Sequence, residues 1–552
     1  MPHFKTHLTV LEQSASLYAS SPAFKVPRLN PETQEILEWH SISYSQFLAD
    51  VELFAKFWTQ RFSADGVPPR SVVGVWLGGM TYLDAIHIYS IARAGYVPQF
   101  FSLRLPNPEV IFELLAKSNG KALIYDSSFA DIVHTSPVPA HIAIDARNVS
   151  IADVSLPPVA PDVNGSDTLM IFHTSGSTSG RPKLVPCSYA WWQECLRKSA
   201  LATIPPNPHR QDVTTWMYVV ASLPSSQVPD LFSFRGSLCH IGQTFMYSGF
   251  IQHGSCAIQI SSQAFPSSEL MDMITRCHLN RLVQFPTYLT AHIRESRHNP
   301  KLLAMLQGLD EIFYSGLMLS SDDEDWILRH GINIRNCFGS TECGAMLLST
   351  PGKSVPLVPM EGTSYGFFPI NSSLDGPHQN ANARTLELVI LSDSGDCPDP
   401  SLRAADGHYH TGDLFLELPG GGYVSRGRDD DWIKSENSLR CDTKAIEDNV
   451  RATCADLVSE CIVVGNGRPS PALFVEAADP NMNEERLKKD IIRRTRHFHS
   501  RRYLHERISS TNFILVVPRD TLPRTASKGN VRRRAVEDTF KTQLDRMYGV
   551  AC

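Results

Sequence analysis

The chain has 552 residues, which is too many for one hydrophobic core, so more than one domain is expected. Its composition, 42% hydrophobic and 20% charged, is that of a packed globular protein and excludes long disordered tracts. The formal net charge of -6 does not favour nucleic acid as a partner, and no apolar run is long enough to span a membrane.

The twelve cysteines are scattered and never form a C-x-x-C pair, which excludes a zinc ribbon and a dithiol redox motif. The start lacks an apolar signal segment and residues 549–552 do not read S-K-L, so a cytoplasmic protein with free thiols is expected. Lys and Arg outnumber Asp and Glu after residue 430. This excess is typical of a solvated helical face, or alternatively of a surface that attracts a phosphorylated cofactor or an acidic partner.

In chain order, the first 150 residues alternate between short apolar strands and helical patterns. Residues 72–76 and 122–125 are strand-like, and a helical pattern between them continues to residue 91. This alternation is typical of a parallel sheet with crossover helices. A loop rich in Pro, Asn and Gly at residues 156–167 then leads into an apolar strand at residues 169–172.

After residue 380 the pattern changes to short β-like segments separated by Gly, Pro and Asp turns, and the charged segment at residues 426–434 marks a domain boundary. Beyond it the sequence predicts strands at residues 461–464, 472–475 and 513–517. It also predicts one basic amphipathic helix that begins at about residue 483. We therefore expect a large α/β domain at residues 1–429 and a small α+β domain at residues 430–552.

The first motif that suggests chemistry is TSGSTSGRPK at residues 174–183, directly after the apolar strand. Backbone N–H groups beside glycines, hydroxyl groups and a lysine suit the oxygens of a polyphosphate. The motif is not a Walker A loop, because G-x-x-x-x-G-K-[ST] is absent. Taken alone, a loop of this composition is more often a plain turn.

Four further motifs follow in order: NCFGSTE at residues 336–342, YHTGD at 409–413, GRDDDWIK at 427–434 and LPRTASKG at 522–529. The series resembles the acyl-adenylate-forming superfamily, which includes acyl-CoA synthetases, luciferases and the adenylation domains of peptide synthetases. It is most similar to the adenylation domains of fungal peptide-synthetase-like enzymes and to acyl-CoA synthetases. The resemblance spans nearly the whole chain. It implies a large N-terminal domain of stacked β-sheets flanked by helices, with a small β-barrel-like subdomain, and a small mobile α+β C-terminal domain.

The resemblance also implies that ATP and Mg²⁺ are used to activate a small-molecule carboxylic acid as an acyl-AMP. Lys528 would bridge the acid and the phosphate, Thr341 would bind the α-phosphate and Glu342 would hold Mg²⁺. Asp430 would be the hinge about which the small domain turns between two half-reactions. The remaining residues expected to bind ATP or AMP are Thr174, Ser175, Gly176, Ser177, Thr178, Lys183, Ser315, Gly316, Phe338, Gly339, Ser340, Asp413 and Arg428.

Within this set the resemblance assigns distinct roles. Phe338 would stack on adenine, with the turn at Ser315 and Gly316 against the other side of the base. Asp413 and Arg428 would bind the ribose hydroxyls, a role that suits a carboxylate because it accepts two hydrogen bonds at once. Without the motifs, Phe338 would be interpreted as a core aromatic and Glu342 as a surface carboxylate. Asp413 and Arg428 would be interpreted as an ion pair at a domain interface.

The segment LCHIG at residues 238–242 resembles the one that opens the acid pocket, with His240, a further catalytic candidate, in the family's histidine position. Amino-acid-activating domains place an aspartate next to it to pair with the α-ammonium, and here that residue is Ile241. A buried ammonium without a counter-charge costs on the order of several kcal/mol, so an aryl or other non-amino acid is favoured. His240 is alternatively a satisfied core histidine. The other expected pocket residues are Phe313, Cys337, Ala345 and Met346.

The sequence departs from the family's pattern at four places. The phosphate loop carries one extra residue, Ser179, and Tyr189 stands where many members have histidine. In the last motif the lysine precedes the glycine, as Lys528 and Gly529. Asn437 replaces a glycine, which the left-handed conformation of Asn tolerates.

The acyl acceptor implied by the resemblance is a phosphopantetheine thiol. The chain ends about 20 residues after the last motif, so a carrier domain would be separate from this chain or removed from it. A free-standing ligase that uses coenzyme A is the alternative. A non-catalytic nucleotide or acid sensor is a hypothesis of another class, against which Glu342, Asp413, Arg428 and Lys528 argue. A monomer is expected.

Overall fold

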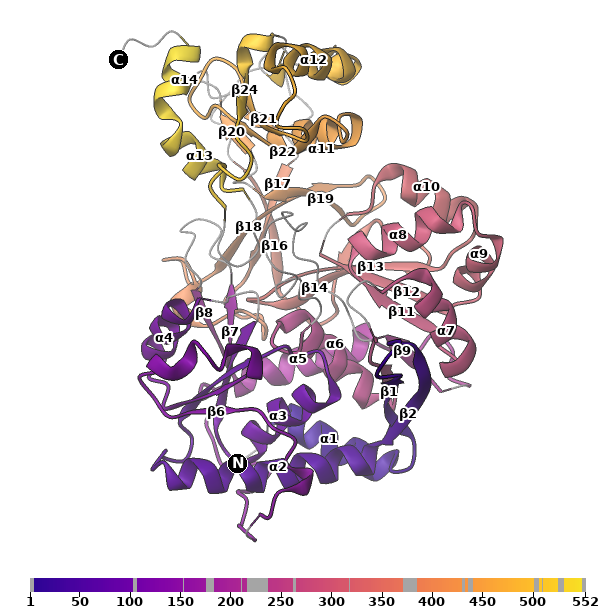
Figure 1. Ribbon diagram of the computed structural model, residues 1–552, viewed down its shortest axis with the longest axis vertical. Coiled ribbons are helices and arrows are strands. Elements are labelled where there is room, and N and C mark those ends of the chain that lie inside the picture. The colour runs from indigo at the N-terminus through magenta and orange to yellow at the C-terminus, as the bar shows by residue number, and fades with distance from the viewer. Residues whose placement is uncertain are drawn as a thin grey trace.

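The computed structural model describes most of the chain (Figure 1). The described residues are 4–102, 107–151, 153–174, 183–209, 211–215, 237–261, 265–316, 318–370, 385–428, 432–434, 440–500, 506–508, 510–524 and 531–548.

The first sheet contains the expected crossover units, with its strands in the order β6-β5-β3-β4-β7-β8. Its neighbours are parallel except for β7 and β8, which form an antiparallel hairpin. Helices α3 (Tyr82–Arg93) and α4 (Pro108–Lys117) lie between successive strands in the chain. The strands are β3 (Val72–Leu77), β4 (Val97–Ser102), β5 (Ala122–Tyr125), β6 (Ala140–Ile142), β7 (Thr168–Thr174) and β8 (Lys183–Ser188).

The second sheet has the order β16-β17-β18-β19-β15-β14-β13-β12-β11-β9-β10-β1-β2. Its centre, from β10 to β13, is parallel, whereas β14 to β19 pair in antiparallel fashion. Strands β14 to β19 continue this large sheet, and the expected small β-barrel-like subdomain stays a prediction. The strands are β1 (Pro22–Leu29), β2 (Ile36–Ser43), β9 (Val213–Thr215), β10 (Cys256–Ile258), β11 (Arg281–Gln284), β12 (Glu311–Ser315), β13 (Ile334–Ser340), β14 (Gly344–Ser349), β15 (Leu357–Pro359), β16 (Tyr365–Pro369), β17 (Thr385–Ile390), β18 (Tyr409–Glu417) and β19 (Tyr423–Arg428).

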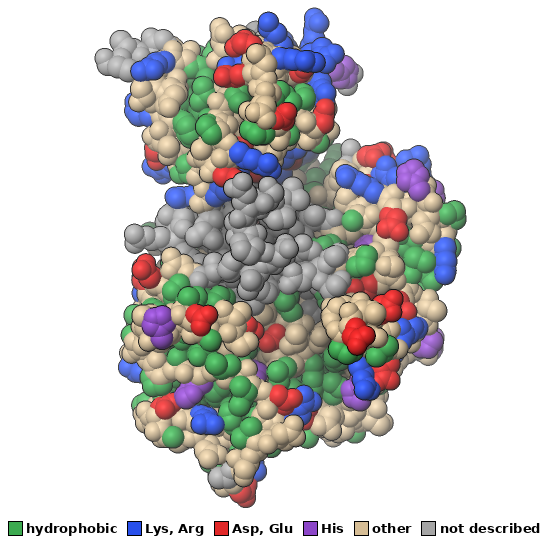
Figure 2. Space-filling view, in the orientation of Figure 1, with side chains coloured by type: hydrophobic (Ala, Val, Ile, Leu, Met, Phe, Trp, Pro, Cys, Tyr) green, Lys and Arg blue, Asp and Glu red, His purple; other side chains and the backbone are tan. Residues whose placement is uncertain are grey.

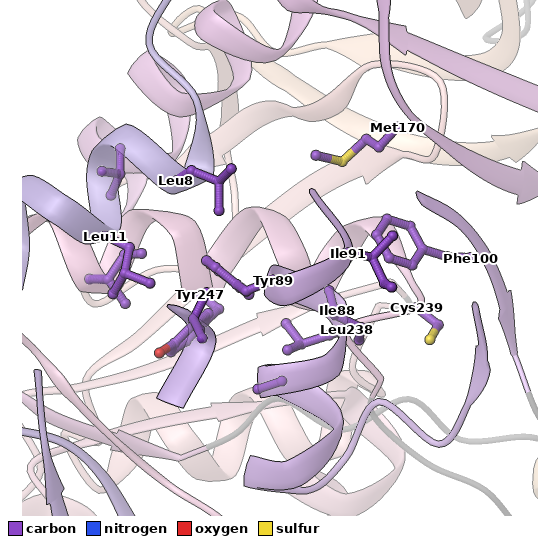
Figure 3. Close-up of a cluster of buried hydrophobic side chains, with 14 of the residues drawn as sticks. Leu8, Leu11, Ile88, Tyr89, Ile91, Phe100, Met170, Leu238, Cys239 and Tyr247 are labelled. Carbon is purple, nitrogen blue, oxygen red and sulfur yellow. The ribbon is translucent and has the colours of Figure 1, made fainter. Parts of the chain in front are cut away.

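The main hydrophobic core lies between the two sheets, because side chains of both sheets and of the intervening helices pack in one cluster. Helix α6 is buried at nearly every position, which its apolar composition all around the axis allows. Figure 3 shows part of this core, where Leu8 and Leu11 of α1, Tyr89 of α3 and Tyr247 of α6 lie near one another. The helices are α1 (His7–Leu17), α2 (Tyr44–Ala64), α5 (Tyr189–Ala202) and α6 (Ile241–Gln252).

The opposite face of the parallel strands is covered by a second cluster. Neighbouring strand residues alternate between the clusters, so Leu282 packs in the second and Val283 in the main core. The covering helices are α7 (Ser267–Cys277), α8 (Pro286–Ser296), α9 (Pro300–Gln307) and α10 (Ser321–Arg329).

The C-terminal α+β domain stands above the large domain in Figure 1 and has hydrophobic clusters of its own. Its sheet has the order β22-β23-β24, beside the hairpin β20-β21. Figure 2 shows Lys and Arg side chains gathered at the top of this domain. The exposed basic side chains of α12 include Arg486, Lys489, Arg493 and Arg496. The elements are β20 (Trp432–Lys434), β21 (Arg440–Asp442), α11 (Thr443–Thr453), β22 (Val458–Val464), β23 (Ala472–Ala477), α12 (Glu484–Ser500), β24 (Ile514–Val517), α13 (Arg533–Thr539) and α14 (Lys541–Met547).

The predicted fold class, a large N-terminal α/β domain with a small α+β C-terminal domain, is confirmed. The boundary between residues 429 and 430 stays a prediction, since residues 429–431 lie outside the described residues. In the described part of the chain, no helix has both the length and the apolar composition that a membrane crossing requires. No disulfide joins the described cysteines, which are buried.

Candidate active site

The motif at residues 174–183 connects the two strands of the β7–β8 hairpin. Thr174, the last residue of β7, pairs with Lys183, the first residue of β8, so the two ends of the loop lie side by side. The loop leaves the carboxyl end of β7, the edge at which ligands bind in open α/β sheets. The predicted phosphate-binding residues Ser175, Gly176, Ser177 and Thr178 lie outside the described residues.

His173, which precedes this loop, is held on three sides. Its Nδ1 donates to the Phe100 carbonyl oxygen at 2.8 Å, and the amide of Gln99 lies 3.1 Å from its Nε2. The ring stacks on Phe101, with 4.8 Å between centroids. Burial lowers the pKa of His173 to about 4, so the ring stays neutral at physiological pH with its proton on Nδ1. The sequence analysis passed over His173 because its partners lie on a different strand.

Thr341 and Glu342 lie in the tight turn that joins β13 to β14. The Cys343 N–H donates to Ser340 Oγ at 3.2 Å and closes this turn. Gly344, with φ of 66°, begins the next strand in a left-handed conformation that suits glycine. The side chains of Thr341 and Glu342 are only half-buried, so both remain accessible to a ligand.

Asp413 on β18 and Arg428 at the end of β19 are direct partners in the antiparallel register. Arg428 Nη1 lies 3.5 Å from Asp413 Oδ1, with 43% and 12% of the respective side chains exposed. The Asp413 N–H donates to Thr411 Oγ1 at 3.0 Å, which fixes the local course of the strand. The two residues expected to bind the ribose are therefore adjacent.

Tyr409, the first residue of β18, links this pair to the turn between β13 and β14. The pKa of Tyr409 lies above its ordinary value because the phenol is shielded from water and because the charges of Glu342 and Asp413 disfavour the phenolate, while Arg428 acts in the opposite direction. Sequence reasoning missed Tyr409, although its place in the YHTGD motif was a signal.

The same turn lies beside helix α5, which directly follows β8. A Cβ on Gly344 would lie 3.4 Å from Cys195 Sγ. Burial raises the pKa of the Cys187 thiol on β8, and the charges of Cys195, Asp399 and Glu342 act in the same direction.

The residues expected around the adenine lie on adjacent parallel strands. Ser315, at the end of β12, pairs with Cys337 of β13, and Gly316 follows with φ of 103°. Phe338 is half-buried and meets the ring of Phe415 edge to face, with 5.0 Å between centroids. Gly339 and Ser340 complete β13. Stacking of Phe338 on a base stays a prediction.

Four of the expected pocket residues belong to the main core between the sheets: Ile241, Phe313, Cys337 and Ala345. Val283, which the sequence analysis did not single out, lies on the same face of the neighbouring strand β11. Met346 does not join them. It packs with Leu347 and with side chains of β15, β17 and β18 in another cluster. The β13–β14 register shifts here, since Gly339 pairs with Ala345 and Phe338 with Leu347, so Met346 is the extra residue of an irregularity. A place for Met346 in the acid pocket stays a prediction.

His240 is the N-cap of helix α6. Its Nδ1 accepts a hydrogen bond from the Gly242 N–H at 3.1 Å, and the side chain is half-buried. Capping satisfies one of the backbone donors left free at a helix start. The structure therefore gives His240 a local structural role, whereas its catalytic role stays a prediction.

Lys528 and Asp430 lie outside the described residues. The segment that leads to Lys528 is anchored inside the C-terminal domain, where Arg524 and Val531 form an antiparallel bridge. Arg524 Nη2 donates to Glu476 Oε2 at 2.8 Å, and the Leu522 N–H donates to Glu476 Oε1 at 3.0 Å.

Glu342 is the described residue that the sequence predicts as a magnesium ligand. No cluster of three or more His, Cys, Asp or Glu side chains suited to a metal occurs among the described residues. Mg²⁺ usually keeps several waters and is bound by one or two carboxylates together with substrate phosphates. A half-buried carboxylate such as that of Glu342 fits this mode of binding.

The fold and the order of its motifs define an adenylate-forming enzyme. The sequence pattern of the AMP-binding enzyme family matches residues 12–366, and that of the AMP-binding enzyme C-terminal domain matches residues 430–551. The chain belongs to the AMP-binding enzyme family, within the acyl-adenylate-forming superfamily.

Two relatives show how similar the chain is to individual proteins of this kind. The chain is 36% identical over 529 residues to the AMP-binding domain-containing enzyme iboA of Amanita muscaria, covering 94% of this chain and 98% of that protein. It is 23% identical to the adenylate-forming reductase stbB of Stachybotrys bisbyi, over 84% of this chain but only 41% of that protein.

Solved structures share the fold at low sequence identity. O-succinylbenzoate coenzyme A synthetase from Bacillus subtilis, in complex with AMP, superposes with a TM-score of 0.71 at 16% identity, covering 96% of this chain and 98% of that chain. The anthranilate CoA ligase AuaEII, in complex with anthranoyl-AMP, gives a TM-score of 0.68 at 16% identity, covering 98% of both chains.

Proposed function

We propose that the protein activates an aryl or other non-amino carboxylic acid with ATP and passes the acyl group to the phosphopantetheine thiol of a carrier protein. The observation that carries the proposal is the pairing of Asp413 with Arg428 on β18 and β19, together with the ring contact between Phe338 on β13 and Phe415 on β18 that joins the motif-bearing strands. It unites motifs that are distant in sequence and that serve different parts of a nucleotide.

In the first half-reaction, a carboxylate oxygen attacks the α-phosphorus, the bond to the bridging oxygen of the β-phosphate breaks, and pyrophosphate leaves. Asp413 would accept hydrogen bonds from the ribose hydroxyls, and Thr341 would donate to an α-phosphate oxygen. Glu342 would hold Mg²⁺, which when bound neutralises phosphate charge. Lys528 would neutralise the charge that develops between the acid and the phosphate.

In the second half-reaction, a thiolate attacks the acyl carbon, AMP leaves and a thioester forms. We place the hinge for this step at Asp430, so that the C-terminal domain turns and withdraws Lys528 before the thiol arrives.

The acid class rests on the apolar character of the described pocket residues. Ile241 occupies the position at which a carboxylate would pair with an α-ammonium, and Phe313, Cys337 and Ala345 add no negative charge. An amino acid would therefore bury an ammonium without a partner. Two structural neighbours are named for aryl acids, o-succinylbenzoate and anthranilate, which supports the class without identifying the acid.

The acceptor is proposed from the resemblance to fungal peptide-synthetase-like domains. Coenzyme A is the second candidate, because the same two structural neighbours are named as CoA-forming enzymes. Both candidates present the same phosphopantetheine thiol.

A hydroxamate assay tests the first half-reaction. The purified chain is mixed with ATP, Mg²⁺, hydroxylamine and a panel of aryl, aliphatic and amino acids. We expect hydroxamate with aryl or other non-amino acids. Preference for an amino acid would contradict the acid class, and no hydroxamate with any acid would favour the sensor hypothesis.

A competition experiment separates the acceptors. With the preferred acid and ATP, coenzyme A and a phosphopantetheinylated carrier protein are supplied separately and the thioester is measured. We expect the carrier protein to be loaded faster. Turnover with coenzyme A alone would establish the free-standing ligase instead.

A further inference from the structure

A buried lysine lies behind the turn that carries Thr341 and Glu342. Lys198 on α5 has no exposed side-chain surface, and its ammonium meets three acceptors. Nζ lies 2.7 Å from the carbonyl oxygens of Cys343 and Ala345 and 2.6 Å from Asp396 Oδ2. Since an ammonium has three N–H donors, each has one acceptor here.

Asp396 is equally well surrounded. Its carboxylate accepts hydrogen bonds from the Tyr365 hydroxyl and from Ser394 Oγ, the latter at 2.5 Å. Its backbone carbonyl accepts from Trp191 Nε1 at 3.0 Å, which is a second connection to α5. Lys198 and Asp396 therefore tie three parts of the large domain together: helix α5, the start of β14 and the loop after β17.

A hydrocarbon side chain of similar length would fill this volume without the desolvation cost of a buried ion pair. Such a side chain could not donate hydrogen bonds to two backbone carbonyls and a carboxylate, as the Lys198 ammonium does. Burial works against the charge of Lys198, but Asp396 raises its pKa above the ordinary value, so the ammonium persists at physiological pH.

The two carbonyls bound by Lys198 belong to residues on either side of Gly344, directly after Glu342. The Cys343 N–H is meanwhile bound by Ser340 Oγ on the opposite side of the turn. The turn is thus clamped at both ends, while the side chains of Thr341 and Glu342 stay accessible.

We propose that Lys198 is a positioning residue for adenylation, which holds the turn between β13 and β14 so that Thr341 and Glu342 point at the α-phosphate and its Mg²⁺. The inference rests on the proposed function of this turn. Lys198 itself touches neither substrate nor metal in this scheme and acts through two backbone carbonyls.

The test compares two variants of the same network. The double variant Lys198→Met and Asp396→Asn removes both charges together, which avoids leaving one charge buried alone. The control Tyr365→Phe removes one hydrogen bond from Asp396 and leaves the Lys198 contacts to Cys343 and Ala345 in place. For each protein, acyl-AMP formation is measured against free Mg²⁺ and against ATP, and thioester formation is measured from supplied acyl-AMP.

We expect the double variant to lower kcat for acyl-AMP formation by about tenfold to hundredfold, the scale of loss for a misplacement of about 1 Å. The Mg²⁺ concentration for half-maximal rate should rise by about fivefold or more, and thioester formation from supplied acyl-AMP should stay within about threefold of the starting protein. The Tyr365→Phe variant should keep the original Mg²⁺ dependence, whatever its thermal stability.

Other outcomes overturn the inference. An unchanged Mg²⁺ midpoint with equal loss of both half-reactions would mean that the network is only structural. A shifted midpoint in Tyr365→Phe would mean that the effect does not depend on the Lys198 contacts to the turn. If the unaltered protein forms no acyl-AMP at all, it is the proposed function that fails.

Discussion

At the scale of single residues, Asp413 shows how a side chain is held in place. Its backbone N–H donates to Thr411 Oγ1, and its carboxylate lies 3.5 Å from Arg428 Nη1. Tyr409, His173 and Lys198 were not singled out by the sequence analysis.

The ribose assignment predicts the behaviour of Asp413→Asn. The amide keeps the shape of the carboxylate but offers one acceptor oxygen, so the KM for ATP should rise by about tenfold to hundredfold, as expected when a charged hydrogen bond is lost. The thermal unfolding midpoint should change little. Pyrophosphate exchange against ATP concentration measures the effect, and an unchanged KM would remove Asp413 from the ribose site.

At the scale of elements, the start of α6 is located by a tight contact with the loop after β3. Gly79 has φ of 65°, and a Cβ there would lie 2.4 Å from Ser237 Oγ and 2.8 Å from the Leu238 nitrogen. The Leu238 N–H donates to the Gly79 carbonyl oxygen at 2.8 Å. This contact fixes the segment in which His240 caps the helix and Ile241 enters the core.

A comparison of Gly79 with Gly66 separates the stability effect of this contact from the effect of backbone strain alone. Gly66 also has a left-handed φ, of 71°, but its Cβ would meet no atom within 4 Å. We expect Gly66→Ala to cost roughly 1 to 2 kcal/mol of stability from conformation alone. Gly79→Ala should cost about 1 to 3 kcal/mol more, because neighbouring atoms must move.

Urea unfolding of both variants provides the comparison. Gly79→Ala should also raise the KM for the acid, since the segment entering α6 shifts. Equal stabilities and unchanged acid binding in the two variants would show that the contact does not position this segment.

At the scale of the whole molecule, two domains with separate hydrophobic cores are joined through residues near 430. Five motifs supply the candidate site, four on the large domain or at its end and the last on the small domain. The segment before Lys528 is anchored to Glu476 within the small domain, so a rotation of that domain would carry this segment with it.

Domain rotation predicts a selective effect of Lys528→Ala. Acyl-AMP formation should fall by about a hundredfold or more, because the developing charge loses its ammonium. Thioester formation from supplied acyl-AMP should be largely spared, since the lysine would then be away from the site. Single-turnover assays of each half-reaction measure this, and an equal loss in both would contradict the assignment.

Low pH should destabilise the folded protein, because several buried histidines are neutral in the folded state and gain protons on unfolding. Burial lowers the pKa of His7 and His87 to about 3 and of His173 and His292 to about 4. In the unfolded chain these groups gain protons below about pH 6.5. The unfolded state therefore binds more protons between about pH 6.5 and 4, and the free energy of unfolding should fall as pH falls through this window.

His87→Asn isolates one of these groups. An amide oxygen can replace Nδ1 as the acceptor for Trp58 Nε1, which lies 3.1 Å from it, without titrating. Urea unfolding between pH 6.5 and 4 should show a slope that is smaller by about 1.4 kcal/mol per pH unit than in the starting protein. An unchanged slope would mean that His87 does not titrate on unfolding.

Much of the fold could be predicted from local pattern. The apolar run at residues 72–76 forms β3, residues 169–172 lie within β7, and the basic helix expected from about residue 483 is α12. Each of these signals depends on residues close together in the chain. The order of the five motifs likewise predicted the family, because it is read along the chain and needs no knowledge of contacts.

Tertiary structure decided which side chains meet. Ala345 and Met346 are neighbours in sequence, but they pack in different hydrophobic clusters, at a point where the β13–β14 register shifts. Lys198 donates a hydrogen bond to the Cys343 carbonyl oxygen, directly after Glu342, and the charge of Glu342 raises the pKa of Tyr409. Both interactions join residues that are far apart in sequence, so no local pattern encodes them. The sequence by itself determined the elements, the family and most candidate residues. The arrangement that could make them one site arises only when packed sheets bring distant strand ends together.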